Sequence, residues 1–165
     1  MVTAGDIHAI LHDVTDPEIP VLSIYDLGIV RDVQVQDDLI EIKITPTYSG
    51  CPAMDAIAVD IRLRLAEHGF KNTRITQVLA PAWTTDWMTQ EGKEKLLAYG
   101  IAPPTGIVKN QARLDRLFSD ELEDIHCPRC GSVDTRLLSQ FGSTACKSLH
   151  QCNSCKEPFD HFKCH

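Results

Sequence analysis

Two Cys-x-x-Cys pairs near the C-terminal end constrain this chain more than any other feature. They are Cys127-Pro128-Arg129-Cys130 and Cys152-Asn153-Ser154-Cys155. In each turn the two sulfurs converge on one point, and two such turns complete a tetrahedral set of four thiolates. The spacing therefore predicts a zinc ribbon over residues 125–165, with Cys127, Cys130, Cys152 and Cys155 as ligands of one metal ion.

Zinc is the expected metal, and iron in a rubredoxin-like site is the alternative because four thiolates suit either ion. Free thiols are a further alternative, but a segment this short has too little apolar material to fold without a metal. A closed four-thiolate set leaves no open coordination position, so its expected role is structural. Between the two pairs, residues 133–141 and 148–151 are expected to form a hairpin, with Gly142 at the bend.

Other residues near the ribbon could also bind metal. The chain has seven cysteines, six of them after residue 126, and such clustering favours metal ligation over disulfides in a reducing compartment. Cys146 and Cys164 lie outside the four-cysteine set. They are either ordinary ribbon cysteines or thiols that face a second metal or cluster. His161 and His165, close to Cys164 in the sequence, are expected to be exposed terminal residues.

The segment before the ribbon has the pattern of an α+β domain. Its order of helix, hairpin, helix, strand and helix predicts a mixed three-stranded sheet covered by helices on one side. We expect this domain over residues 1–101 and a linker over 102–124. The expected elements are a helix over 4–14, hairpin strands over 33–36 and 40–44, a helix that begins at Pro52 and is capped by Gly69, a strand over 75–79 and a helix over 91–99 capped by Thr89.

The loop Thr45-Pro46-Thr47-Tyr48-Ser49-Gly50-Cys51-Pro52 is the second informative segment. Cys51 is expected at the N-cap of the following helix, where the helix dipole and free N–H groups stabilise a thiolate. It is a soft metal ligand, a nucleophile or a buried inert cysteine, and no histidine in the loop could serve as its base. Asp16 and Glu18 lie in a proline-stiffened turn, which taken alone predicts a solvated turn with a cap.

Charge and hydropathy exclude several classes of function. Residues 1–126 carry 11 Lys+Arg against 20 Asp+Glu, a balance of −9, whereas residues 127–165 carry 5 against 3, a balance of +2. An acidic main body argues against non-specific nucleic-acid binding. The chain shows neither a signal-peptide pattern nor an apolar run near the ~20 residues of a membrane helix. We therefore expect a cytoplasmic protein with no nucleic-acid or membrane partner.

Several motifs together resemble those of SufT-like iron–sulfur assembly domains, over about residues 6–101. They are Asp16-Pro17-Glu18-Ile19-Pro20, Asp26-Leu27-Gly28, Thr45-Pro46-Thr47, Gly50-Cys51-Pro52 and Pro81-Ala82-Trp83-Thr84-Thr85-Asp86-Trp87. With the cysteine ribbon included, nearly the whole chain is similar to the PaaD (also called PaaJ) family. Members of that family are accessory proteins of the bacterial phenylacetyl-CoA epoxidase system.

The resemblance implies a non-catalytic role in phenylacetate catabolism, in which the protein matures the metal centres of the epoxidase machinery. The expected client is the reductase, which in that system carries a flavin and a [2Fe–2S] cluster, and oxygenase subunits are further candidate partners. The family's reactive cysteine falls on Cys51, its acidic pair on Asp16 and Glu18, and its loop threonine on Thr47. The resemblance leaves open whether Cys51 holds a transient cluster, a single iron or a client thiolate.

Two other functions remain as alternatives, a stoichiometric structural subunit of the oxygenase and a thiol-dependent enzyme that uses Cys51 as nucleophile. A homodimer is also compatible with the sequence. One further hypothesis concerns the two additional cysteines. If the ribbon folds back over the α+β domain, Cys146 and Cys164 could join Cys51 in an open site that accepts and releases a cluster.

Overall fold

The computed structural model describes residues 2–104 and 124–163. The chain divides into two compact units, Met1–Gly92 and Lys93–His165. Within the described residues, no helix is long and apolar enough to cross a membrane. The division lies before residue 101, the expected end of the first domain, because the residues after Gly92 pack with the ribbon.

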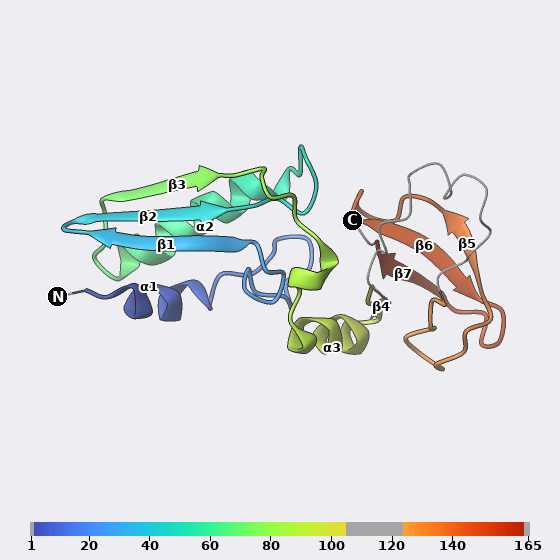
Figure 1. Ribbon diagram of the computed structural model, residues 1–165. Coiled ribbons are helices and arrows are strands. Elements are labelled where there is room, and N and C mark those ends of the chain that lie inside the picture. Colours follow the sequence, from blue (N-terminus) through green and yellow to red (C-terminus); the bar gives the residue numbers. More distant parts are fainter. Residues whose placement is uncertain (1, 105–123, 164–165) are drawn as a thin grey trace. The chain divides into compact units, whose positions relative to one another are not determined.

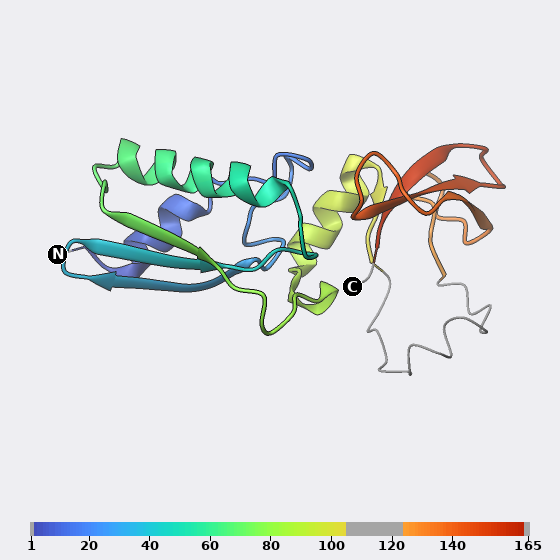
Figure 2. The same ribbon diagram turned by 90° about the horizontal axis from the view of Figure 1, so that it is seen from above.

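The first unit is built around a three-stranded sheet in the order β1-β2-β3 (Figure 1). Strands β1 and β2 are antiparallel, whereas β2 and β3 are parallel, so the sheet is mixed. Figure 2 shows α1 and α2 on the same side of this sheet, which confirms the expected α+β class. The elements are α1 (Ala4–Leu11), β1 (Val30–Gln36), β2 (Leu39–Ile44), α2 (Ala53–Glu67), β3 (Thr73–Gln77) and the 3-10 turn η1 (Thr85–Trp87).

Alternation along β2 explains why helices cover one face. Ile40, Ile42 and Ile44 are buried, while Glu41 and Lys43 between them are half-exposed. Helix α2 buries residues at helical spacing, namely Ala53, Met54, Ile57, Ile61 and Leu65. Each fully buried aliphatic side chain contributes about 1.5–3 kcal/mol relative to an exposed one, so this apolar layer holds the sheet and helices together.

Helix α1 begins as expected and ends early. Thr3 forms a capping box with Asp6, in which each side chain accepts a hydrogen bond from the other residue's backbone N–H. The helix stops at Leu11, three residues before the expected end at Val14. Val14 is still buried, but its carbonyl accepts a hydrogen bond from the Ile24 N–H at 3.0 Å, so the chain has left the helix there.

Other boundaries of the first unit differ from expectation by one to three residues, and β1 begins at Val30 instead of residue 33. Helix α2 has Pro52 as its N-cap, so Cys51 precedes the cap instead of occupying it. Strand β3 covers Thr73–Gln77 instead of 75–79, because its register is set by parallel pairing with β2 from Ile40 to Ile44. Helix ends and strand ends are the least certain parts of a prediction from sequence.

The second unit is a four-stranded sheet in the order β4-β7-β6-β5. Its elements are β4 (Ile101–Ala102), β5 (Thr135–Ser139), β6 (Lys147–Cys152) and β7 (Pro158–Phe162), and helix α3 (Gln90–Tyr99) leads into it from the first unit. The β5–β6 hairpin confirms the expected ribbon. Thr89 Oγ1 accepts a hydrogen bond from the Gly92 N–H at 2.9 Å, which confirms the predicted cap of α3.

Strands β4 and β7 were not predicted from the sequence. Ala102, expected in the linker, pairs with His161 of β7 and is buried. The rest of the expected linker, apart from Pro103, Pro104 and Asp124, lies outside the described residues. The expectation that His161 is exposed was wrong, because β7 places it between β6 and β4, where it is 2% exposed. His165 also lies outside the described residues.

Candidate metal centre and cysteine loop

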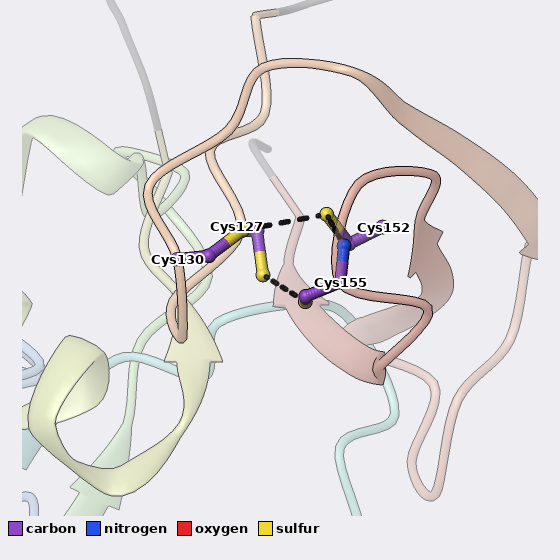
Figure 3. A group of neighbouring side chains, drawn as sticks. All are labelled: Cys127, Cys130, Cys152 and Cys155. Carbon is purple, nitrogen blue, oxygen red and sulfur yellow. Dashed lines mark hydrogen bonds between the residues drawn. The ribbon is translucent and has the colours of Figure 1, made fainter.

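The four predicted ligand sulfurs converge at one end of the ribbon (Figure 3). One ligand atom from each of Cys127, Cys130, Cys152 and Cys155 lies within 4.8 Å of the others. The Sγ atoms of Cys127 and Cys155 are 3.7 Å apart, and those of Cys130 and Cys152 are 3.5 Å apart. Four sulfurs at ~2.3 Å from a tetrahedral ion are about 3.8 Å apart, so the donor set fits a metal ion.

Backbone geometry prepares the site for thiolates. The Cys155 N–H donates to Cys152 Sγ at 3.5 Å. The backbone N–H groups of Cys155 and Ser154 lower the pKa of the Cys152 thiol to about 6, despite its burial. The first Cys-x-x-Cys turn is closed by the Gly131 N–H, which donates to the Cys127 carbonyl at 2.9 Å. The N–H contacts at Cys152 favour the deprotonated sulfur that a metal ion requires.

Two of the four ligand cysteines are buried and two are exposed to solvent. Cys127 and Cys152 are buried, and they belong to an apolar cluster with Ala102, Ile125 and Phe159. Cys130 and Cys155 are exposed. The ion would therefore anchor the apolar interior of the ribbon to its two surface turns, which suits a structural role.

Cys146 lies before β6, at the end opposite Cys152, and it is buried. Its Sγ lies 3.0 Å from Thr144 Oγ1, and its carbonyl accepts a hydrogen bond from the Lys163 N–H at 3.0 Å. Cys164 lies outside the described residues. Cys51 and Cys146 belong to different units, and their shared cluster site with Cys164 stays a prediction.

The Cys51 loop connects the end of β2 to the start of α2 in the first unit. The Cys51 N–H donates to the Tyr48 carbonyl at 3.2 Å, and the Tyr48 side chain hydrogen-bonds the Cys51 sulfur. Gly50 has a φ of 83°, a left-handed conformation that glycine adopts without strain. The turn from Tyr48 to Cys51 therefore fixes where the half-buried thiol lies.

The acidic turn is near enough for its charges to act on this thiol, and it is more ordered than a solvated turn. Asp16 is 9% exposed, and its Oδ1 accepts hydrogen bonds from the N–H groups of Glu18 and Ile19, both at 2.8 Å. The charges of Glu18 and Asp16 both contribute to the pKa of Cys51. The structure thus brings the thiol within electrostatic range of two carboxylates that lie more than 30 positions before it in the sequence.

The expected stabilisation of a Cys51 thiolate is outweighed in the structure. Burial raises the pKa of Cys51, a hydrogen bond from the Ala53 backbone N–H lowers it, and the charges of Glu18 and Asp16 raise it. The predicted help from the helix start is therefore present but smaller than the cost of burial. A thiol in this setting is held neutral, and it would lose its proton on binding iron.

Two threonines precede Cys51 in the same loop. Thr47, the predicted loop threonine, is half-buried. Thr45 is buried, and its Oγ1 has no hydrogen-bond partner within the described part of the chain. Tyr48 was not predicted as a site residue. Its position three residues before Cys51 is the signal that could have indicated it, because a turn brings residues at this spacing together.

The fold and the cysteine geometry define the class of protein, an iron–sulfur assembly domain joined to a zinc ribbon. The family model "Iron-sulfur cluster assembly protein" matches residues 5–73, and the model "PaaD zinc beta ribbon domain" matches residues 115–163. The chain is also 49% identical to an Escherichia coli K12 protein named as a subunit of a "Putative 1,2-phenylacetyl-CoA epoxidase", over 96% of this chain and 92% of that protein. It belongs to the PaaD family.

Other relatives share the first unit. The "Fe-S protein maturation auxiliary factor" of Porphyromonas gingivalis W83 is 38% identical over 57% of this chain and 90% of its own length. The crystal structure of a domain of unknown function, DUF59, from Bacillus anthracis matches with a TM-score of 0.53 and 28% identity, over 56% of this chain and 90% of that one. A conserved hypothetical protein from Thermotoga maritima matches with a TM-score of 0.50 and 30% identity, over 58% of this chain and 94% of its own.

Proposed function

We propose that this protein is a non-catalytic, cytoplasmic maturation factor of the phenylacetyl-CoA epoxidase system that delivers an iron–sulfur cluster to the system's [2Fe–2S] reductase. The observation that carries the proposal is a half-buried Cys51 within electrostatic range of Asp16 and Glu18, in a domain of the iron–sulfur assembly family. The relative named as a maturation auxiliary factor supports the cluster role, and the epoxidase-subunit relative supports the pathway.

Cys51 would hold the cluster as an exchangeable ligand. A cysteine thiol of the recipient would lose its proton and bond to iron as the bond between iron and Cys51 Sγ breaks, and Cys51 would take up a proton. Nothing is oxidised or reduced in this exchange. Asp16 and Glu18 would orient the loop or complete the ligand set, and the hydroxyls of Thr47 and Tyr48 lie in the same loop. A single loop cysteine suits release better than a closed cage does.

The four-thiolate site of the ribbon would hold a structural ion and would not take part in the exchange. Its four thiolates form a complete set, which suits a resident structural zinc ion. We keep Cys146 and Cys164 as proposed additional ligands of the transferred cluster. For Cys146 this role requires the ribbon to open locally, because its sulfur is buried beside Thr144.

The test is cluster content of the client in cells. The reductase would be purified anaerobically from hosts that carry wild-type protein, the Cys51→Ala variant or no copy, and its visible spectrum and iron content compared. We expect [2Fe–2S] absorbance with the wild type only. Full cluster content in the reductase from all three hosts would overturn the proposal.

A second function, a stoichiometric structural subunit, is favoured by one observation. The epoxidase relative is itself called a subunit. The two functions differ in what survives purification, because a subunit stays with the oxygenase whereas a maturation factor leaves. Size-exclusion chromatography of the affinity-purified oxygenase separates them. Constant one-to-one retention of this chain would support the structural role.

A further inference from the structure

Exposed apolar side chains gather on one short stretch of the ribbon. Val133, Leu137, Leu138 and Phe141 are between 45 and 66% exposed, and we call them the β5 patch. Within residues 124–163, they are the only large apolar side chains with such exposure. Four of them within nine residues are unusual on a surface where single exposed apolar residues are normal.

Strand β5 presents these side chains at the edge of the sheet. It is the last strand in the order β4-β7-β6-β5, and it pairs only with β6 among the described strands. The register shifts between Leu137 and Ser139, so Leu138 is an extra, bulged residue. A bulge re-aims a side chain and interrupts the hydrogen-bonding edge. The patch is therefore suited to docking by side chains and poorly suited to adding a strand.

Two cations adjoin residues of the patch and are held in place: Arg136 precedes Leu137 in β5, and Lys163 lies over Phe141. The Arg136 guanidinium donates from Nε to Gln151 Oε1 at 3.2 Å and from Nη2 at 2.5 Å. Lys163 Nζ lies 4.6 Å from the centroid of the Phe141 ring and donates to the Gln140 carbonyl at 3.1 Å. Exposed apolar residues with fixed cations next to them match a partner surface that carries carboxylates beside its own apolar residues.

The net charge of the ribbon also favours an acidic partner. Residues 127–165 carry 5 Lys+Arg against 3 Asp+Glu, a balance of +2, whereas residues 1–92 carry 6 against 14, a balance of −8. Self-association of two β5 patches about a two-fold axis would bring like charges together, which disfavours it. A nucleic acid would meet the repulsion of a chain with a net charge of −7.

We infer that the β5 patch is the surface through which the ribbon docks a protein partner, and that the partner presents an apolar patch rimmed by Asp and Glu side chains. This inference rests on the proposed function, in which the ribbon meets a client. It deepens that function by assigning recognition to Leu137, Leu138 and Phe141, and partner orientation to Arg136 and Lys163. Delivery of the cluster stays with the Cys51 loop.

Binding of the full-length, zinc-loaded protein to the purified reductase and to the purified oxygenase tests this inference. Two variants alter the patch: Leu138→Ser combined with Phe141→Ser, and Arg136→Glu combined with Lys163→Glu. The matched control is Val59→Ser combined with Leu63→Ser, since these two residues are similarly exposed on α2. Zinc content and circular dichroism verify that each variant is folded.

We expect the apolar variant to bind at least one of the two proteins roughly 10-fold or more weakly, as is usual when central apolar contacts are lost. The charge variant should bind more slowly and lose its dependence on salt, and the α2 control should bind within about 2-fold of the wild type. The inference is overturned if both patch variants bind as the wild type does, or if the wild type binds neither the reductase nor the oxygenase. The inference is also overturned if the patch variants change only self-association or DNA binding and leave binding to the two proteins unchanged.

The Cys51→Ala variant separates this inference from the proposed function. It should dock with wild-type affinity while failing to supply the cluster. If the reductase obtains its cluster normally with Cys51→Ala, the proposed function fails. Binding of the patch variants then still decides whether the ribbon docks through β5. If the patch variants bind and deliver normally, docking through β5 fails and the maturation role remains.

Discussion

Cys130 Sγ lies 3.5 Å from Cys152 Sγ, although 22 positions separate the two residues in the sequence. This contact joins the two turns of the ribbon at the end of its hairpin. Because two of the five residues in the buried apolar cluster of the ribbon are the ligands Cys127 and Cys152, a metal ion held by these turns would contribute a large share of its stability.

Replacing Cys127 with serine should remove the metal ion. The variant keeps three thiolates, and affinity for zinc depends on the full tetrahedral set. We expect loss of about one zinc ion per chain, lower solubility and a lower melting temperature, measured by metal analysis and calorimetry. The matched control is Cys146→Ser, which alters a buried ribbon cysteine outside the ligand set. Full zinc content in Cys127→Ser would show that the ligand set is misassigned.

Replacing Cys51 with alanine should spare the fold and abolish delivery of the cluster. Cys51 precedes the N-cap of α2 and is half-buried, so the cost to stability should be on the order of 1 kcal/mol. Thermal unfolding checks the fold, and the absorbance of the purified reductase checks delivery. The exposed Ser49 in the same loop provides the control Ser49→Ala, which should leave both measurements unchanged.

Glycine at position 28 should be required by a steric contact and not by backbone conformation alone. Gly28 and Gly69 both have positive φ, 68° and 90°. A Cβ at Gly28 would lie 2.1 Å from the Trp87 carbonyl oxygen, whereas a Cβ at Gly69 meets nothing within 4 Å. We expect Gly69→Ala to cost about 1–2 kcal/mol from backbone strain and Gly28→Ala a further ~1–3 kcal/mol from the clash. Equal losses in urea unfolding would contradict this explanation.

Acid should destabilise the ribbon through His161. Burial and the neighbouring His150 lower the pKa of His161 to about 4, compared with ~6.5 in an unfolded chain. The unfolded state therefore binds an additional proton between these values. The contribution of His161 is complete above pH ~6.5 and is lost as the pH falls toward 4, by up to about 3 kcal/mol. Burial also lowers the pKa of His150, so it acts in the same direction.

The measurement is the free energy of unfolding as a function of pH for the wild type and for His161→Phe, which retains a ring and cannot be protonated. The variant should show a shallower loss of stability between pH 6.5 and 4. Protonation of the cysteine ligands also releases zinc in acid, but it acts equally in both proteins. Identical pH profiles would argue against a buried neutral His161.

Replacing Cys146 with serine tests the shared cluster site. If Cys146 joins Cys51 as a ligand, this variant should deliver less cluster to the reductase while it keeps its zinc ion. Thr144→Val is the control, because it removes the hydroxyl that lies 3.0 Å from the Cys146 sulfur and leaves the thiol in place. Normal delivery by Cys146→Ser would leave Cys51 to act with the recipient's ligands alone.

Local patterns in the sequence were sufficient to predict much of this protein. The spacing of Cys127, Cys130, Cys152 and Cys155 predicted the convergence of four sulfurs, because a Cys-x-x-Cys turn fixes its geometry within four residues. Alternation at Ile40, Ile42 and Ile44 predicted β2 and its buried face, since a strand has a period of two. The capping box at Thr3 is likewise a local pattern.

Features that depend on contacts between distant segments were decided only by the tertiary structure. Strand β7 and the burial of His161 result from pairing with β6 and β4, and no local pattern marks His161 as an interior residue. The pKa of Cys51 is raised because burial and two carboxylates from a distant turn outweigh the N–H group at the helix start. Residue type and spacing determine which groups are present, but desolvation and charge depend on what the folded chain places around each of them.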